Sequence, residues 1–489
     1  MGRKLQSKLT CKKKNVKEGN RFLQQRRKEL AVLVDTLLKL TSTFQSTGKS
    51  FEHHLQIEKI IKEIINIESI SNKSTNRQRK LYIENYVSWL HEHGAEFEGV
   101  EISEFDGYGF GLKATKDFSE GSLILTVPGK VMMSEKDPKA SDLSEFINID
   151  PLLQNMPNVT LALFLLLEKN NPNSFWKPYI DVLPEKYSTV LYFNSEELAE
   201  LRPSPVFESS LKLYRSIVRQ YAYFYNKIHT IDLPVLKNLQ DIFTFDNYRW
   251  AVSTVMTRQN NIVQGTAFTL TNAFIPLWDM CNHKHGKITT DFNLELNRGE
   301  CYALQDYRRD EQIFIFYGAR PNSDLFLHNG FVYPDNDYDS LSIALGISPN
   351  DALRNGKVNL LNKLGLSGVT NFSLYKGASP ISVELLAFIR IFNMNQEELE
   401  KWSAESIPSD LLSFETGTEY NMASIDKRGF TYLLTRCGLI RGTYKDSGGD
   451  VQSEHRKNIK LLKQCEVQIL ENAIKYLRDV IDKISGDEK

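Results

Sequence analysis

Cysteine is scarce in this sequence, with five among 489 residues. The five lie far apart and include no Cys-x-x-Cys pair and no Cys/His cluster at the spacing of a zinc site. Cysteines this few exclude a small secreted scaffold that is held together by disulfides. The sequence therefore predicts reduced thiols in an intracellular protein, with no structural metal.

Long apolar runs are also missing. Runs such as Leu161–Leu167 are far shorter than the ~20 residues that cross a bilayer. The first residues are charged rather than apolar, which is not the pattern of a secretory signal. We therefore expect neither a membrane-spanning helix nor export.

The sequence has no excess of charge of either sign, since its formal net charge is −1. This balance argues against a dedicated nucleic-acid-binding protein. It conceals an asymmetry, because residues 1–30 carry eleven basic and two acidic side chains. The clusters Lys12–Lys14 and Arg26–Lys28 fit a nuclear address or a patch for a polyanion, but a solvated terminus is the simpler interpretation. We expect a cytoplasmic location, and a nuclear one as well if this tail acts as an address.

Periodic apolar residues predict helices over most of the chain. Leu30, Val34 and Leu37 recur at helical spacing within residues 20–68. Similar patterns occupy residues 79–93 and 140–255 and return after residue 334. Strand patterns fall in two blocks, of which the first begins at Glu101 among closely spaced glycines. The strand-like runs are Leu123–Val127, Thr269–Trp278, Cys301–Leu304 and Gln312–Tyr317.

This distribution predicts an α+β fold rather than a series of βαβ units. Residues 1–93 contain the basic tail and N-terminal helices. Residues 94–134 and 256–334 are expected to form one discontinuous strand-rich domain, interrupted by a helical insert over residues 135–255. Residues 335–489 are expected to form a C-terminal helical domain.

Three alternate glycines mark the segment Gly107–Leu112 (GYGFGL). Glycine lets a backbone approach a ligand closely or adopt a positive φ. The order of residues differs from the GxGxxG dinucleotide fingerprint, and no βαβ unit surrounds it. A tight hairpin without a ligand explains the segment equally well.

The segment Trp278–His283 (WDMCNH) places Asp, Asn and His in one turn beside an aromatic residue. It fits a capped turn over a core tryptophan. It also fits half of a metal site, with His283 and His285 as ligands, or a nucleophile pair of Cys281 and His283. The sequence offers no third ligand and no context that would activate the thiolate, so both chemical alternatives are disfavoured.

Two further motifs contain one candidate residue each. Arg258, in Arg258-Gln259-Asn260, could hold a carboxylate, although a surface arginine is the usual case. Tyr317 ends a strand-like run before a glycine, where an aromatic residue is common. No carboxylate pair, Ser/His/Asp series or GxxxxGK[ST] loop accompanies them. Residue patterns alone therefore lead only to an intracellular α+β protein with a glycine-rich turn.

Taken in order, the four motifs resemble those of the SET-domain methyltransferases. The long insert is similar to that of the subgroup containing Rubisco lysine methyltransferase, and the resemblance is closer still to the actin-histidine N-methyltransferases of animals. It is strong over about residues 79–400 and faint outside them. The stretches that carry it include Asn173–Pro184 (NSFWKPYIDVLP), Arg219–Tyr225 (RQYAYFY), Tyr248–Asn260 (YRWAVSTVMTRQN), Ile275–His283 (IPLWDMCNH) and Pro380–Phe392 (PISVELLAFIRIF).

The resemblance implies a SET domain of short twisted sheets with knot-like C-terminal threading, a helical insert and an all-α C-terminal substrate-binding domain. It implies S-adenosylmethionine as cofactor, S-adenosylhomocysteine as product, and no metal. Arg79 and Arg258 match positions that contact the cofactor carboxylate, and Asn329, where the actin-directed enzymes have Ser, begins a segment over the adenine. The positions that match cofactor contacts are Arg79, Tyr108, Gly109, Phe110, Arg258, Asp279, Met280, Cys281, Asn282, His283, Asn329, Gly330 and Phe331.

Tyr317 matches the family's catalytic tyrosine, whose hydroxyl could orient the methyl group through weak C–H···O contacts. A histidine substrate, with a pKa near ~6.5, is mostly neutral at pH 7, whereas lysine near ~10.4 must first lose a proton. Asn260 could fix a substrate imidazole by hydrogen bonding one ring nitrogen. Trp278 is expected to wall the substrate slot and Arg320 to hold the substrate peptide, although a core aromatic and a surface charge are the alternatives.

These matches imply a protein-histidine N-methyltransferase that acts on actin. We expect a monomer that requires neither nucleic acid nor a membrane. Two alternatives stay open: a protein-lysine methyltransferase with another substrate, and a catalytically silent SET protein that binds actin.

Overall fold

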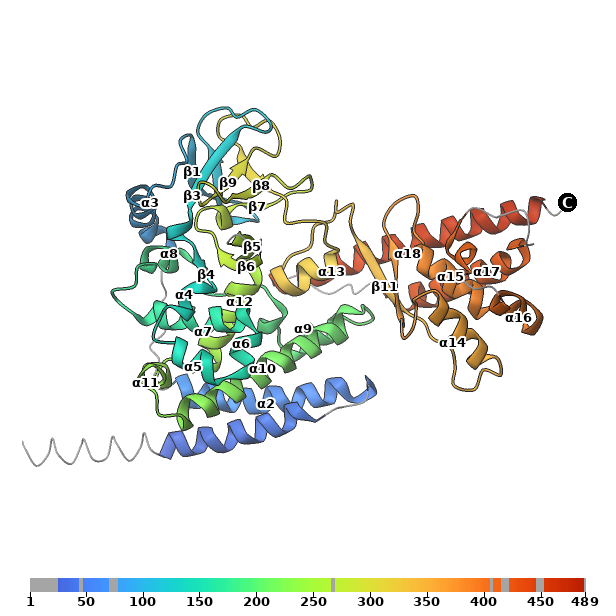
Figure 1. Ribbon diagram of the computed structural model, residues 1–489, viewed down its shortest axis with the longest axis horizontal. Coiled ribbons are helices and arrows are strands. Elements are labelled where there is room, and N and C mark those ends of the chain that lie inside the picture. Colours follow the sequence, from blue (N-terminus) through green and yellow to red (C-terminus); the bar gives the residue numbers. More distant parts are fainter. Residues whose placement is uncertain are drawn as a thin grey trace, which may run out of the picture. The chain divides into compact units, whose positions relative to one another are not determined.

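The computed structural model describes residues 25–43, 47–69, 78–264, 269–404, 408–414, 422–445 and 453–487 (Figure 1). The basic cluster Lys12–Lys14 lies outside the described residues. The chain folds into two compact units, Met1–Tyr187 with Ser210–Gly318, and Ser188–Ser209 with Ala319–Lys489. Residues 188–209, within the predicted insert, thus belong to the second unit.

The first described elements of the first unit are two long helices, residues 25–42 and α2 (Ser50–Ser69), as their apolar spacing predicts. Val34, Leu37, Ile57 and Ile61 are buried along the stripe that they share. Glu68 ties α2 to the insert, because its carboxylate accepts hydrogen bonds from Tyr221 Oη at 2.6 Å and from the Phe245 amide at 2.9 Å. A short 3₁₀ turn, η2 (Arg79–Tyr82), and α3 (Ile83–Glu92) follow.

The insert is helical, as predicted, and α7 lies at its centre. The run Leu161–Leu166 is buried on all sides of α7, which explains its continuous apolar pattern. Figure 1 shows α7 and α12 between the strands at one end of this unit and α2 at the other. The remaining helices and short turns of this unit are η1 (Thr47–Lys49), η3 (Gly129–Val131), α4 (Lys136–Lys139), α5 (Ser144–Ile149), α6 (Pro151–Asn155), α7 (Pro157–Asn170), α8 (Lys177–Val182), most of α10 (Val206–Thr230), α11 (Pro234–Gln240), α12 (Phe245–Arg258) and η5 (Trp278–Met280).

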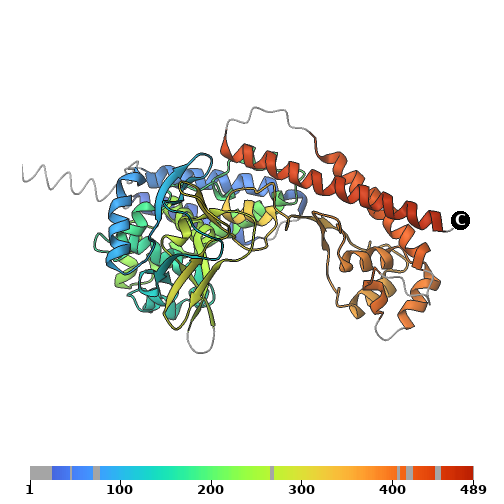
Figure 2. The ribbon, with the colours of Figure 1, turned by 90° about the horizontal axis from the view of Figure 1, so that it is seen from above.

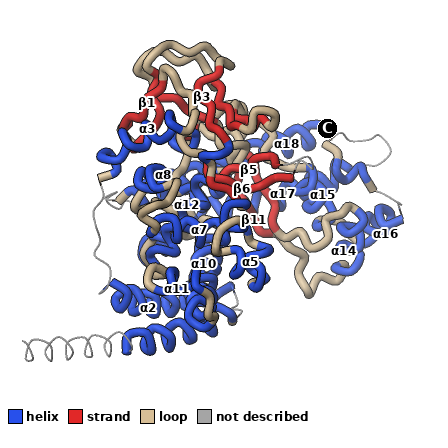
Figure 3. The backbone as a smooth tube through the Cα atoms, turned by 60° about the vertical axis from the view of Figure 1, so that its left-hand side comes forward, coloured by secondary structure: helices blue, strands red, loops and turns tan. Residues whose placement is uncertain are grey.

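Three small sheets, drawn red in Figure 3, form the strand-rich part of the first unit. One has the order β1-β2-β10-β7, from β1 (Val100–Phe105), β2 (Gly109–Ala114), β10 (Gln312–Ile315) and β7 (Asn282–His283). The second has the order β3-β9-β8, from β3 (Leu123–Pro128), β9 (Arg298–Tyr302) and β8 (Thr290–Asn293). The third has the order β4-β6-β5, from β4 (Met133–Ser134), β6 (Thr269–Phe274) and β5 (Gln259–Gln264).

The register of β10 positions the end of this strand block. β10 pairs antiparallel with β2 and parallel with β7, so that Ile315 lies opposite His283. The next residues, Phe316 and Tyr317, therefore pass directly beside His283. Because the strands that pair here are far apart in sequence, a local pattern could not reveal the pairing.

The second unit is mainly helical, as predicted, and its longest helix, α18 (Glu454–Asp487), packs against α17 (Met422–Thr443) (Figure 2). It also contains an antiparallel strand pair, β11 (Ser340–Ala344) and β12 (Asn371–Tyr375), so the prediction of an all-α domain was incomplete. Leu341 and Ile343 alternate with exposed neighbours, a period of two that is typical of a strand. The other elements are η4 (Val190–Tyr192), α9 (Ser195–Glu200), α13 (Asn322–Asp324), η6 (Leu325–Asn329), α14 (Arg354–Lys363), α15 (Val383–Phe392), α16 (Gln396–Ala404) and η7 (Ser409–Leu412).

The core of the second unit contains a buried ion pair. Arg390 on α15 donates to both carboxylate oxygens of Asp426 on α17, at 2.6 and 3.0 Å, and to the carbonyls of Asp410, Leu411 and Ser413. Such a buried charge is tolerated only when its donors are satisfied.

None of the described helices is both long and apolar enough to span a bilayer.

Candidate active site

The glycine-rich segment forms the turn between β1 and β2, so the predicted hairpin is confirmed. Gly107 and Gly109 have φ values of +74° and +70°, which favour glycine although the space around both is open. Gly111 is needed for a different reason. A Cβ atom there would lie 2.6 Å from Gln312 Nε2 and 2.9 Å from Asn282 Nδ2.

The side chains around this turn come from three strands. Tyr108 is half exposed and its ring lies edge-on to Phe314, with centroids 5.5 Å apart. Asn282 Nδ2 donates to the carbonyl of Phe110 at 3.3 Å, which joins β7 to the turn. The structure thus brings the GYGFGL motif and Asn282 of the WDMCNH motif together.

Two arginines lie near one buried carboxylate beside the turn, and Arg258 forms the ion pair with it. Arg258 Nη1 donates to the Asp279 carbonyl at 2.6 Å and lies 3.4 Å from Asp279 Oδ2, which also accepts a hydrogen bond from Tyr179. The Arg79 guanidinium lies 4.8 Å from the centre of the Phe110 ring, and its Nε donates to the Val182 carbonyl at 2.7 Å.

The electrostatics of this pair favour an anion. Burial, and after it the positive charge of Arg258, lowers the pKa of Arg79 to about 10. Burial raises the pKa of Asp279, although the neighbouring Arg258 acts in the opposite direction. Two cations face a single carboxylate, and the buried Arg258 Nε has no hydrogen-bond partner among the described residues. A bound carboxylate would satisfy that donor and balance the second positive charge.

A strained turn at Leu277 presents the WDMCNH segment. Leu277 has φ +70° and ψ −52°, and the Trp278 amide donates to the Pro276 carbonyl at 2.9 Å. This is a γ-turn, which is rare for a side chain of this size. The Leu277 amide is held by Tyr86 Oη at 2.6 Å, so the strain of about 1–3 kcal/mol is stabilised by packing around it. The turn directs the carbonyl of Asp279 toward Arg258.

Tyr317 follows β10 and is fixed at both ends. Its hydroxyl donates to the Cys281 carbonyl at 2.7 Å, and its amide donates to His283 Nδ1 at 3.1 Å. Burial raises the pKa of Tyr317, so the phenol stays protonated at neutral pH. The hydroxyl proton is committed to Cys281, which leaves the oxygen lone pairs for weak acceptor contacts.

The structure argues against a cysteine nucleophile. Cys281 is buried, and a hydrogen bond with Cys301, followed by burial, raises the pKa of its thiol well above the usual value. A reactive thiolate requires the opposite shift. The described residues include no group of three or more His, Cys, Asp or Glu side chains that could hold a metal ion with His283.

Asn260 and Trp278 are the two residues predicted to contact the substrate histidine or to wall its slot, and their surroundings differ. Asn260 is the second residue of β5, opposite Ala273, and its Nδ2 donates to the Arg258 carbonyl at 3.0 Å. This contact orients the side-chain amide of Asn260 so that its oxygen can accept a hydrogen bond. Trp278 is buried, with its ring edge about 3.2 Å from where a Cβ on Gly299 would lie, so it packs in the core as one alternative anticipates.

The remaining predicted positions lie in the second unit. Arg320 Nη1 donates to Asn329 Oδ1 at 2.8 Å, and burial lowers the pKa of Arg320. Gly330 ends the η6 turn with φ +80°, and a Cβ there would lie 2.7 Å from the Ser188 backbone. Asn458 Nδ2 donates to the Gly330 carbonyl at 3.0 Å, and Phe331 is half-buried. The structure thus places Arg320 as a support for Asn329.

Three tyrosines that the sequence analysis did not single out support the arginine pair. Tyr179 and Tyr86 hold Asp279 and Leu277, and Tyr187 hydrogen bonds with Thr254 at 2.8 Å beside Arg258. Tyr179 lies in one of the stretches that carry the family resemblance. Nothing in the local pattern of the other two distinguishes them from ordinary core tyrosines.

The chain is similar to known proteins over most of its length. Residues 109–318 match the SET domain model, and residues 348–481 match the model described as Rubisco LSMT substrate-binding. The chain is 40% identical to the actin-histidine N-methyltransferase of Danio rerio, over 91% of this chain and 77% of that protein. It is 39% identical to the one of Homo sapiens, over 92% of this chain and 77% of that protein.

Solved structures share the fold. Rubisco LSMT bound to AdoMet superposes with a TM-score of 0.64 at 20% identity, covering 82% of this chain and 93% of that one. The SET domain of LSMT bound to lysine and AdoHcy gives a TM-score of 0.65 at 18% identity, covering 83% and 92% of the two chains.

Proposed function

This chain belongs to the actin-histidine N-methyltransferase family of SET-domain proteins, and we propose that it transfers a methyl group from S-adenosylmethionine to a histidine side chain of actin. The observation that carries the proposal is the pairing of a buried anion site, Arg79 with Arg258, with a hydroxyl fixed at Tyr317. The first suits the carboxylate of the cofactor, and the second suits an aligned methyl transfer.

The residues present fit S-adenosylmethionine. Arg79 and Arg258 would hold its carboxylate, since the buried Arg258 Nε needs an acceptor. The turn at Tyr108–Phe110 would take its methionine end, and Asn282 and His283 would line it. When bound, the cofactor supplies an electrophilic methyl group on a sulfonium. The chain's own task is to align the acceptor and to exclude water.

Tyr317 acts as an orienting group rather than as a base. Its raised pKa keeps the proton on the hydroxyl, and that proton points to the Cys281 carbonyl. The lone pairs that remain can receive weak C–H···O contacts from a polarised methyl group. The hydroxyl therefore favours one methyl orientation without changing its own protonation.

Asn260 favours histidine over lysine as the acceptor. With its Nδ2 committed to the Arg258 carbonyl, its oxygen can accept the N–H of a neutral imidazole and leave the other ring nitrogen with a free lone pair. Lysine would need a base to remove a proton. The nearby carboxylate, Asp279, is already bound by Arg258 and Tyr179.

Mass mapping of the product tests this proposal. The purified chain is incubated with S-adenosylmethionine and actin, and tryptic peptides are searched for the mass of one added methyl group. We expect the methyl group on a histidine. A methyl group on lysine alone would support the lysine-directed alternative. Cofactor binding without any transfer would support the catalytically silent actin-binding alternative.

A further inference from the structure

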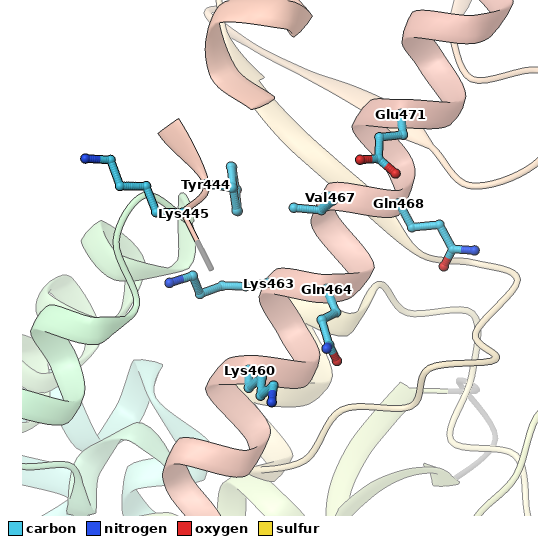
Figure 4. Close-up of a pocket in the computed structure, with 8 residues that line it drawn as sticks. All are labelled: Tyr444, Lys445, Lys460, Lys463, Gln464, Val467, Gln468 and Glu471. Carbon is cyan, nitrogen blue, oxygen red and sulfur yellow. The ribbon is translucent and has the colours of Figure 1, made fainter. Parts of the chain in front are cut away.

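A basic groove lies along α18 in the second unit, apart from the residues discussed above. It has a volume of about 380 Å³ and is lined by residues of α18 and by Tyr444 and Lys445, which follow α17. Figure 4 shows Val467 pointing from α18 toward Tyr444, and Lys463 extending from the same side of the helix. The Tyr444 ring and Val467 form an apolar floor. Lys445, Lys460 and Lys463 lie around it.

The lysines of this groove carry uncompensated positive charge. Lys445 and Lys460 are exposed and have no ion-pair partner among the described residues. Lys463 Nζ donates to the Glu200 carbonyl at 3.3 Å, and the acidic group that its charge acts on is the buried Glu466.

The two acidic groups near the groove do not neutralise it. Glu471 forms an ion pair with Arg441 at 2.9 Å. Glu466 is buried beneath the groove, where Tyr444 Oη and Ser204 Oγ donate to its carboxyl at 3.0 and 2.6 Å. Burial raises the pKa of Glu466 to about 7, so much of it is protonated near neutral pH.

We propose that this groove binds an acidic segment of the protein substrate. An apolar floor with lysines at its rim suits an extended stretch in which Asp or Glu alternates with apolar residues. Its size fits a few side chains, at the lower end of ligand sites. The proposal rests on the proposed function for the identity of the partner, but the binding itself can be measured without methyl transfer.

The first test measures binding to the full chain. A fluorescent polyglutamate peptide and a glycine-serine peptide of equal length are titrated with the protein at about 20 mM and about 300 mM NaCl. We expect polyglutamate to bind at low salt and the neutral peptide not to bind. The double variant Lys445→Gln/Lys460→Gln should weaken this binding about fivefold, from two exposed charge pairs.

The matched control removes two charges from the same helix outside the groove. Lys475→Gln/Lys483→Gln, at exposed positions of α18, should leave the affinity for polyglutamate unchanged. Equal losses in both double variants, or no binding by the wild-type chain, would overturn the proposal. Binding that appears only after Asp446 and Asp450 are changed to Asn would assign the groove to the chain's own residues 446–452, and would also overturn it. If double-stranded DNA bound through the same lysines more tightly than polyglutamate, that result would also overturn the proposal.

The second test uses methyl transfer. With intact actin, the Lys445→Gln/Lys460→Gln variant should raise KM about fivefold at low salt and leave kcat unchanged. With a short histidine peptide, KM should not change. An unchanged KM for actin would overturn the assignment of the partner. Absence of transfer by the wild-type chain, with polyglutamate binding intact, would instead contradict the proposed function alone.

Discussion

The proposed alignment of the methyl group depends on the hydroxyl of Tyr317. Tyr317→Phe keeps the ring, whose centroid lies 5.1 Å from that of His283, and removes the hydroxyl that donates to Cys281. We expect kcat to fall on the order of 10²-fold, with cofactor affinity changed less than about twofold. Single-turnover kinetics and calorimetric titration of the cofactor measure the two quantities. Equal losses in rate and affinity would make Tyr317 a structural residue.

The two arginines should respond differently to the same substitution. Arg79 has no ion-pair partner in the part of the chain that the structure describes, so Arg79→Gln should weaken cofactor binding about tenfold or more and change thermal stability little. Arg258→Gln also leaves Asp279 buried without its partner, which costs about 3–5 kcal/mol. The double variant Arg258→Gln/Asp279→Asn should regain most of that stability but not the affinity. Thermal unfolding and cofactor titration of the three variants check this, and equal destabilisation by both single changes would contradict it.

Candidate residues could be proposed from the sequence where a motif surrounds them. Tyr317, Arg258 and Asn282 lie in short segments that resemble a known family, and the structure brings Arg258 and Asn282 to the same strand block as Tyr317. Tyr179 was not predictable, because its partner Asp279 is 100 residues away and the contact exists only after packing. Local patterns also could not show that Arg320 supports Asn329.

At the scale of an element, Glu68 joins α2 to the insert and makes the stability of this contact depend on pH. Burial raises its pKa to about 7 from the ordinary 4.5, despite hydrogen bonds from Tyr221 and Phe245. The folded chain therefore binds this proton more tightly than the unfolded chain. The contribution of the group to stability is complete below the ordinary pKa and is lost as the pH rises through about 7.

Glu68→Gln should remove this part of the pH dependence. Thermal unfolding of the wild-type chain should show stability falling from about pH 5 to pH 8, and the variant should show a flatter curve. Glu466 has the same direction of shift, so its contribution should persist in the variant. Parallel curves for the wild type and Glu68→Gln would show that Glu68 does not carry the coupling.

Elements with a strong period were predicted well, and short or strained ones were not. The spacing in residues 25–42 and α2 matched their burial. The run Thr269–Trp278 gives a strand only to Phe274, because Pro276 and the γ-turn at Leu277 end it. The strands β11 and β12 are each five residues long within helical sequence, so they were missed.

At the scale of the whole molecule, the sequence predicted a discontinuous strand-rich domain and a helical C-terminal part. It could not show that residues 188–209 join the second unit. Their partners are far along the chain, since Glu197 on α9 bonds His455 at 3.0 Å and Ser204 bonds Glu466. Each contact joins residues more than 250 positions apart, a separation that no local pattern encodes.

We propose that the site transfers a methyl group to a histidine that is already neutral, so that no base is needed. The pH dependence of kcat/KM for actin is the measurement that decides this. We expect a rise of about tenfold per pH unit at low pH, and a plateau above about pH 7, where the imidazole has lost its proton. A rate that keeps rising toward about pH 10 would indicate an amine that must be deprotonated, and would contradict the claim.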